Sequence, residues 1–300
     1  MPHYNTYPLY LKQRFGTPVL KIPLNAGFSC PNRDGTIGAN GCSFCDNRSF
    51  SPVAITAASL IDQFTHAIHK DRDKYSAFIA YLQPFTNTYA KVARLSEIYE
   101  PLIRYPGVVG LAVGTRPDCL DTAVCDYLAD VSKRTYLSIE IGLQSASDSV
   151  LAANNRGHGV SDFVNATAKL DVLGIETVAH VMIGLPGDTV AGAVQTAKFI
   201  ASLPVAGVKI HQLMIVAGTR IHRWFLQEKL QPLTLEQYGE TLCEFLAHLR
   251  PDQLIHRIMA NSSTKNGLVT PLWSAEKMRS LNYLHAMMEK KNLVQGSKYK

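Results

Sequence analysis

The strongest constraint on the fold of this chain is a repeated alternation of strand-like and helix-like segments. Alternation of this kind predicts a parallel sheet whose strands are joined by right-handed helical crossovers. The expected strands cover residues 19–24, 77–83, 108–115, 135–144, 177–184 and 207–213. The expected helices cover residues 57–69, 92–105, 122–131, 160–173 and 190–203. Six strand units are too few for a closed eight-stranded barrel, which leaves an open sheet or a partial barrel.

Polar residues on one face of the strands favour the partial barrel. In the segment 135–144, four aliphatic side chains alternate with polar or small residues, and side chains two positions apart lie on the same face of a strand. A sheet covered by helices on both faces would instead carry almost continuous apolar runs. A barrel with helices outside and a polar lumen inside accounts for the pattern. The residues expected to face this lumen are Ser138, Glu140, Gly142, Gln144, His180, Met182, Lys209 and His211.

The alternation stops after the sixth strand, and a different organisation follows. We predict a barrel core over residues 1–215 and a C-terminal extension over residues 216–300. The extension is expected to contain helices near 235–249 and 275–291, with a short run at 253–258 between them. The expected fold class is therefore α/β, a partial (β/α)6 TIM-like barrel with a C-terminal helical extension over one end.

Composition excludes several classes of protein. The chain has 300 residues, of which 46% are hydrophobic, as in a globular protein with a large core. No apolar run approaches the length of a membrane span, and the first residues lack the apolar stretch of a secretion signal. Six cysteines without an export signal indicate reduced thiols rather than a disulfide scaffold. We therefore expect a cytoplasmic protein with no membrane partner.

Basic residues are concentrated towards both ends of the chain, and the formal net charge is +6. Such ends can follow a phosphate backbone, although solvated surface charge explains them equally well. The residues that we name as candidates for phosphate contacts are Lys12, Arg14, Lys277, Arg279, Lys290 and Lys291.

One loop contains three cysteines in the spacing C-x11-C-x2-C: Cys30, Cys42 and Cys45. The loop follows the first expected strand, and loops in that position carry the active sites of (β/α) barrels. Thiolate ligands select zinc or an iron–sulfur cluster, and structural zinc needs a fourth ligand. A four-iron cluster held by three cysteines leaves one iron open to another ligand. The remaining cysteines, which show no metal-ligand spacing, are Cys119, Cys125 and Cys243.

With this loop, the sequence resembles the radical S-adenosylmethionine (radical SAM) superfamily. Gly41 before Cys42 and Phe44 before Cys45 also fit the pattern of that family. The resemblance implies a [4Fe–4S] cluster whose open iron is chelated by SAM. It implies reductive cleavage of SAM to a 5′-deoxyadenosyl radical, with a flavodoxin- or ferredoxin-type electron donor. The long first gap is typical of the branch that contains the elongator catalytic subunit.

Over residues 4–291, the chain looks like one bacterial family of this superfamily, the YhcC/YtqA type. The matching stretches are KIPLNAGFSCPNRDG, QPFTNTYA, GTRPDCL, EIGLQS, NRGH, IGLPGDT, KIHQL and PLWSAEKMRSLN. This resemblance implies a partial barrel of the radical SAM type that acts on the C5 substituent of wobble uridine in tRNA. One alternative is radical chemistry on a small molecule such as a tetrapyrrole. Another is a non-catalytic, zinc-dependent nucleic-acid-binding module, in which His180 or Cys119 would supply the fourth ligand.

The resemblance also assigns SAM contacts to the carboxyl ends of the strands. Three residues are expected to offer oxygen atoms to the SAM amino group, and two arginines are candidates for its carboxylate. Glycines after the fifth strand are expected to let the backbone approach adenine. The SAM-binding residues implied in this way are Phe44, Gln83, Thr86, Asn87, Arg116, Glu140, Gln144, Arg156, Gly184 and Gly187.

Several of these positions have a simpler structural interpretation. Arg116 could form an ion pair with Asp118, and a buried Glu140 should be paired either with ligand or with Lys209. The dipeptide 188–189 is expected to cap the next helix. The residues that we name as candidates for substrate contact are His180, Lys209, His211, Lys277 and Arg279.

Overall fold

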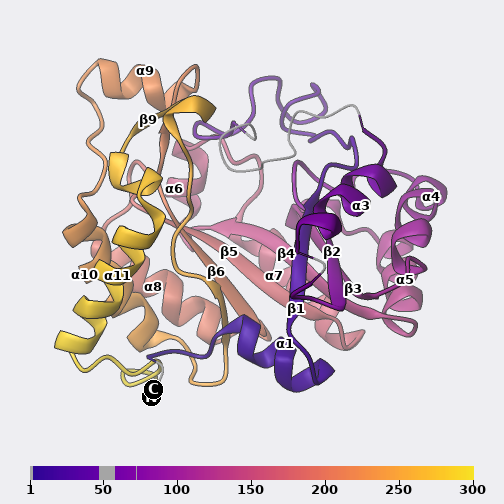
Figure 1. Cartoon of the computed structure of the whole chain (residues 1–300). Helices are drawn as coiled ribbons and strands as arrows, with labels where there is room; N and C mark the ends of the chain where they lie inside the picture. Colours follow the sequence, from indigo (N-terminus) through magenta and orange to yellow (C-terminus); the bar gives the residue numbers. More distant parts are fainter. Residues whose placement is uncertain (1–2, 47–57, 72) are drawn as a thin grey trace.

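A seven-stranded parallel sheet forms the centre of the molecule in the computed structural model, which describes residues 3–46, 58–71 and 73–300. The strands are β1 (Val19–Leu24), β2 (Ala77–Leu82), β3 (Val108–Thr115), β4 (Tyr136–Gln144), β5 (Glu176–Ile183), β6 (Gly207–Gln212) and β8 (Leu254–Arg257). They lie in this order across the sheet, with β1 and β8 as its two edges. The sheet curves into an open half-barrel (Figure 1).

The structure confirms the six expected strands, with boundaries that differ by at most one residue. The expected number of strands is wrong, because β8 adds a seventh strand next to β6. This strand lies in the run 253–258, which we had placed in the extension. A four-residue strand that ends in two polar side chains carries too little periodicity to be recognised from sequence. The division of the chain at residue 215 stays a prediction.

Helices cover the outer face of the sheet, and the aliphatic face of each strand packs against them (Figure 1). Leu137, Ile139, Ile141 and Leu143 of β4 all belong to this outer core, as the alternation predicted. The expected helix 57–69 begins at Leu60 in the structure, and residue 57 lies outside the described residues. The helices that connect the strands are α3 (Leu60–Asp71), α4 (Val92–Ile103), α5 (Thr122–Ser132), α6 (Asp148–Ala153), α7 (Val160–Val172) and α8 (Val190–Ala201).

Helix α1 (Tyr7–Phe15), which sequence analysis did not identify, closes one end of the half-barrel. Its buried side chains Tyr7 and Leu11 pack against lumen-facing residues of β2, β3 and β4, among them Tyr81 and Tyr136. Helix α1 lies at the end where the strands begin, so the lumen opens at the other end, where the strands lead into their loops (Figure 1). Functional residues are therefore expected among those loops.

The C-terminal part of the chain packs beside the sheet and over its open end. The expected helices near 235–249 and 275–291 are confirmed, and a short antiparallel pair and helix α9 are additional. None of the described helices combines the length and the apolar character that crossing a bilayer requires. The elements here are β7 (Ile215–Val216), α9 (Arg220–Leu226), α10 (Leu235–His248), β9 (Leu268–Thr270) and α11 (Lys277–Lys290), with short 3-10 turns at Pro117–Cys119, Thr264–Asn266 and Leu272–Ala275.

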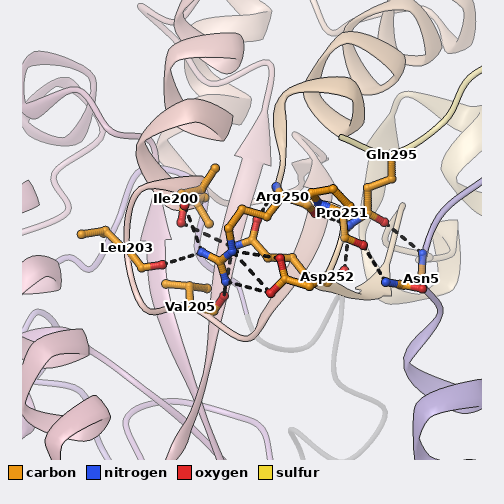
Figure 2. A network of polar contacts seen from close by, with 10 residues as sticks. Asn5, Ile200, Leu203, Val205, Arg250, Pro251, Asp252 and Gln295 are labelled. Carbon is orange, nitrogen blue, oxygen red and sulfur yellow. Dashed lines mark hydrogen bonds and ion pairs between the residues drawn. The ribbon is translucent and has the colours of Figure 1, made fainter. Parts of the chain in front are cut away.

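A polar network joins both ends of the chain to the segment before β8 (Figure 2). The Arg250 guanidinium donates hydrogen bonds of 2.8–3.0 Å to three backbone carbonyls in 201–205, just after α8. Gln295 Nε2 donates to the carbonyl of Arg250, and Gln295 Oε1 accepts from the backbone N–H of Asn5. The network therefore ties the first residues, the last residues and the start of β8 together.

Candidate functional site

A cavity opens at the carboxyl ends of the strands, beside the cysteine loop. The empty space within it is about 1050 Å³, a volume that includes open solvent at its mouth. All three cysteines of the loop line this cavity. The other predicted site residues that line it are Phe44, Gln83, Thr86, Arg116, Glu140, Gln144, Arg156, His180 and His211. Residues from distant parts of the sequence therefore surround one space.

The cysteine loop is held in place mainly by the segment that follows α6. The backbone N–H and the hydroxyl of Ser43 contact the carbonyl and the side-chain oxygen of Asn154 at 2.9 Å and 2.8 Å. Asn32 Nδ2 donates to the carbonyl of Asn155 at 2.6 Å and lies 3.6 Å from Cys42 Sγ. The stretch NRGH at 155–158 therefore contributes to the site as a docking surface for the loop.

Arg156 occupies the space above Gly142. Its Nη2 donates to the Gly142 carbonyl at 2.8 Å, and a Cβ atom at position 142 would lie only 2.3 Å from that nitrogen. The Nε atom of Arg156 is buried and has no hydrogen-bond partner among the described residues. Glycine is needed at 142 because any side chain there would displace the guanidinium. Arg156 thus keeps one donor available at the cavity wall.

Arg116 forms the ion pair that sequence analysis gave as its alternative role. Its Nε and Nη2 donate to the two Asp118 oxygens at 2.9 Å and 2.7 Å, and its Nη1 donates to the Arg156 carbonyl at 2.8 Å. The guanidinium is almost completely buried. Arg116 therefore braces Arg156, and a contact with the SAM carboxylate stays a prediction.

Three of the residues assigned to SAM do not line the cavity, which corrects their expected placement. Asn87 is fully buried, and its Nδ2 donates to three backbone carbonyls that hold the loop after β2. Gly184 and Gly187 both have positive φ, but the close neighbour of Gly184 is Leu233. The backbone freedom of these glycines shapes the turn into α8. The expected cap of α8 is confirmed, with Thr189 accepting from the backbone N–H of Gly192.

Glu140 lies at the centre of a buried ion cluster deeper in the lumen. Its Oε2 lies 2.8 Å from Lys209 Nζ and 2.6 Å from His180 Nε2, and its Oε1 accepts from Lys21. The predicted pairing with Lys209 is confirmed. Burial alone would raise the pKa of Glu140, but the charges of Lys209 and Lys21 outweigh it and hold that pKa well below its usual range.

Burial acts in the opposite direction on the basic partners of Glu140. Desolvation lowers the pKa of Lys209 to about 7 and that of His180 to about 4, although the carboxylate partly offsets both shifts. At neutral pH, His180 is therefore uncharged, and Lys209 is close to its titration midpoint. This places one group that can exchange a proton near pH 7 behind the wall of the cavity.

Sequence analysis missed several lumen residues that surround this cluster. One of them is Lys21, whose Nζ lies 4.2 Å from the centre of the Tyr81 ring, inside the lumen. Its position between Leu20 and Ile22 in the first strand could have revealed this from side-chain alternation. The lumen residues without such a signal, contributed by the unexpected strand β8, are His256 and Arg257.

The basic residues proposed for phosphate contacts do not gather around the cavity. Lys12 and Arg14 belong to α1, at the end of the barrel opposite to the cysteine loop (Figure 1). Several of the others form surface ion pairs; Arg279 pairs with Glu276 in this way. Lys277 and Lys290 are exposed on α11, and Lys291, which follows this helix, pairs with Glu240 at 2.6 Å. The placement favours the alternative of solvated surface charge for these residues, and their contact with phosphates stays a prediction.

Comparison with known proteins agrees with this geometry. The profile of the radical SAM superfamily matches residues 34–200, and that of the radical SAM C-terminal domain matches residues 205–290. YtqA of Bacillus subtilis and YhcC of Escherichia coli K12 are each 36% identical, over 98% and 96% of this chain and 92% of each relative. The chain belongs to the YtqA/YhcC family of radical SAM proteins.

More distant relatives of this radical SAM protein include proteins that are named for tRNA. A tRNA uridine(34) acetyltransferase of Dehalococcoides mccartyi is 27% identical over 154 residues, which are 50% of this chain and 33% of that protein. The solved structure of Elp3 from Methanocaldococcus infernus superimposes with a TM-score of 0.68 at 17% identity, over 93% of this chain and 64% of that one. This similarity confirms the α/β partial-barrel fold of the radical SAM type.

The cofactors of the radical SAM family are a [4Fe–4S] cluster and SAM, and the chemistry of the loop suits the cluster. Burial raises the pKa of Cys45 to about 12, with the neighbouring thiols adding to the shift. Such a thiol keeps its proton unless a metal replaces it. Arg156 Nη1 lies 3.3 Å from Cys42 Sγ, and Arg33 Nη1 lies 3.6 Å from Cys45 Sγ. These cations stabilise thiolates once metal is bound.

The arrangement of the thiols is also unlike a mononuclear zinc site. Among the residues that the structure describes, no three His, Cys, Asp or Glu side chains are placed to hold one metal ion. Zinc requires its ligands to converge on a single ion, whereas each thiolate of an iron–sulfur cluster binds its own iron. The zinc alternative also needs a fourth ligand, for which His180 and Cys119 were the candidates. His180 contacts Glu140 instead, and Cys119 does not line the cavity.

Proposed function

We propose that this radical SAM enzyme acts on the C5 substituent of the wobble uridine in tRNA. The observation that carries the proposal is the 27% identity with a tRNA uridine(34) acetyltransferase, which extends over half of this chain. The shared partial-barrel fold of Elp3 supports it. When bound, the cluster and SAM supply a 5′-deoxyadenosyl radical that abstracts hydrogen from the substrate.

The residues of this chain would hold the cofactors and exclude water. Cys30, Cys42 and Cys45 would bind the cluster through their thiolates. Helix α1 seals the far end of the lumen, and apolar side chains such as Phe44 and Met182 line the cavity wall, so a reactive group there is shielded from solvent. The residues that would contact SAM from the same cavity are Gln83, Thr86, Gln144 and Arg156.

His180 and His211 would contact the substrate. Both line the cavity, and their ring centroids lie 5.7 Å apart on the neighbouring strands β5 and β6. A uridine base splayed out of the anticodon loop would enter past the cysteine loop to reach them. An electron donor of the flavodoxin or ferredoxin type would approach the same loop from outside.

Cations at the mouth of the cavity are better placed to bind tRNA than those on α1. Helix α9 packs on the cysteine loop, with Ile221 in the same apolar cluster as Cys42 and its N–H bonded to the Ser43 carbonyl at 3.1 Å. This helix carries Arg223, and the cysteine loop carries Arg33, which lines the cavity; both residues are exposed. Phosphates flanking the target nucleotide would contact these side chains.

The decisive experiment compares modified nucleosides in tRNA from isogenic cells with and without this protein. We expect a C5-substituted wobble uridine to change in amount and to be restored by the wild-type protein but not by the Cys42→Ala variant. An unchanged set of wobble uridines would exclude tRNA as the substrate and leave the small-molecule alternative.

Binding measurements test the mode of tRNA recognition. The affinity should fall steeply with salt, because each phosphate contact releases counterions. Arg223→Gln should weaken binding of tRNA, whereas Lys12→Gln removes the same charge at the closed end of the barrel and should not. Equal effects of the two variants would contradict a binding surface at the cavity mouth.

A further inference from the structure

A β-bulge turns two consecutive side chains of β8 into the lumen. Val208 of β6 is opposite Ile255, but the next residue, Lys209, is opposite Arg257, so the register shifts by one residue. His256 stacks on the Tyr7 ring at 3.7 Å, and Arg257 contacts His211 on the lumen face of β6. Bulges redirect side chains in this manner and are common next to active sites.

The guanidinium of Arg257, a half-buried side chain in the lumen, has no carboxylate partner among the described residues. Its Nη2 lies 2.6 Å from Nε2 and 3.1 Å from Nδ1 of His211. Its Nε atom is buried without a hydrogen-bond partner among the described residues. Buried arginines are normally paired with a carboxylate, because an isolated charge in a low-dielectric interior is costly. Burial accordingly lowers the pKa of Arg257.

Glu140 compensates this charge only in part. Its carboxylate acts on Arg257 through its charge, but its two oxygens are already hydrogen-bonded to Lys21, Lys209 and His180. In the part of the lumen that the structure describes around this carboxylate, the basic side chains of Lys21, Lys209 and Arg257 share one anion, and the imidazoles of His180 and His211 are neutral because burial lowers their pKa. An additional anion would restore the balance and satisfy the free donor of Arg257.

We propose that Arg257 and His211 form a subsite for an oxyanion group of the substrate, either a carboxylate or a phosphate. His211 lines the cavity, with Arg257 directly behind it on β8. The subsite is separate from Arg116 and Arg156, which lie with the cysteine loop and are candidates for the SAM carboxylate. The guanidinium fork can bind a carboxylate or phosphate through two parallel hydrogen bonds. The inference does not depend on tRNA, since either class of substrate can carry such a group.

Calorimetric titration of the cluster-loaded enzyme, prepared without oxygen, tests the subsite. Sodium acetate and inorganic phosphate serve as probes at constant ionic strength, and neutral acetamide serves as the control ligand. We expect saturable binding of at least one anion and none of acetamide, and the tighter anion identifies the class of group. Arg257→Gln should weaken that binding at least tenfold, whereas Arg94→Gln, on the outer helix α4, should leave it unchanged.

Three results would overturn the proposal: no saturable binding of either anion, equal affinity in Arg257→Gln, or loss of anion binding when SAM saturates the enzyme. The last result would assign the subsite to SAM itself. Circular dichroism and cluster absorbance report whether the variant is folded. If Arg257→Gln is not folded, Arg257→Lys replaces it in the test. The lysine keeps the positive charge but lacks the two parallel donors of the guanidinium, so this variant should bind the anion severalfold more weakly than the wild type. Equal affinity of Arg257→Lys and the wild type would contradict the proposal.

Discussion

Arg156 Nη1 lies 3.3 Å from the sulfur of Cys42, although the two residues are 114 positions apart in the sequence. The contact joins the cysteine loop to the segment after α6, and it places a positive charge beside a thiol that we propose as a ligand of the cluster. A guanidinium in this position stabilises added negative charge, which is what one-electron reduction of a thiolate-bound cluster produces.

Replacement of Arg156 should make the cluster harder to reduce. Arg156→Gln is expected to lower the midpoint potential by on the order of 50 mV, because the favourable charge interaction with the reduced state is lost. A redox titration followed by electron paramagnetic resonance measures the change. Arg156→Lys retains the charge and should shift the potential less, so equal shifts in both variants would argue against an electrostatic role.

The three cysteines of the loop should be individually essential for the cluster. Cys30→Ala, Cys42→Ala and Cys45→Ala are each expected to lose most bound iron and sulfide and to abolish formation of 5′-deoxyadenosine from SAM. The matched control is Cys119→Ala, since Cys119 does not line the cavity. Iron and sulfide analysis with chromatography of the nucleoside products checks this. A comparable loss in the control would reopen the question of a fourth ligand.

The Glu140 carboxylate should be important for stability. Glu140→Gln removes the anion that Lys21, Lys209 and His180 share in a fully buried site. Breaking a buried ion pair by removing one partner leaves uncompensated charge, at a cost of about 3–5 kcal/mol. Urea unfolding measures the loss. The surface variant Glu97→Gln, whose partner Arg94 is largely exposed, should cost less than about 1 kcal/mol.

Lys209 should make the stability depend on pH above neutrality. The folded protein releases this proton near pH 7, whereas the unfolded chain keeps it up to the ordinary lysine pKa of 10.5. Between these values the unfolded state binds more protons, so raising the pH stabilises the folded protein. From pH 6.5 to 9, the unfolding free energy of the wild type should rise by up to about 2 kcal/mol relative to Lys209→Gln. A difference that does not vary with pH would contradict the shift.

Arg250 should stabilise the junction at which the chain termini meet (Figure 2). Arg250→Met removes the side-chain donor of the Ala201 carbonyl and one of the two donors of the Leu203 and Val205 carbonyls. An unsatisfied buried carbonyl costs about 1–3 kcal/mol, so we expect a loss of about that size in urea unfolding. Arg104→Met, at an exposed ion pair on the surface, is the control and should have little effect.

Local pattern was sufficient to predict most of the fold. The six long strands alternate aliphatic and polar residues, and their connecting helices have apolar residues at helical spacing, so both element type and lumen face could be read from short windows. The same alternation put Glu140 and Lys209 on the polar faces of their strands, and their pairing, one of the two alternatives predicted for Glu140, is confirmed. Helix α1 was missed because its buried residues Tyr7 and Leu11 contact lumen residues that come much later in the sequence.

The site could be predicted only in part for a related reason. The cysteine spacing identified the loop, but the partners of Asn87 and Arg116 are set by how neighbouring loops pack. Asn87 Nδ2 holds backbone carbonyls while its Oδ1 is buried without a partner among the described residues, and Arg116 pairs with Asp118. Polar groups that looked available for ligand are therefore partly engaged by the protein. A short motif does not show which of its polar groups are already satisfied.

The amino-acid sequence by itself determined the strand and helix alternation, the polar lumen face and the three-thiol loop, because each depends on residues close together in the chain. Only the tertiary structure decided that Lys21 enters the Glu140 cluster, that Arg156 stands beside Cys42, and that a bulge turns Arg257 inwards. These contacts join residues that are far apart in the chain, and they exist only after strand order, register and crossover have been set.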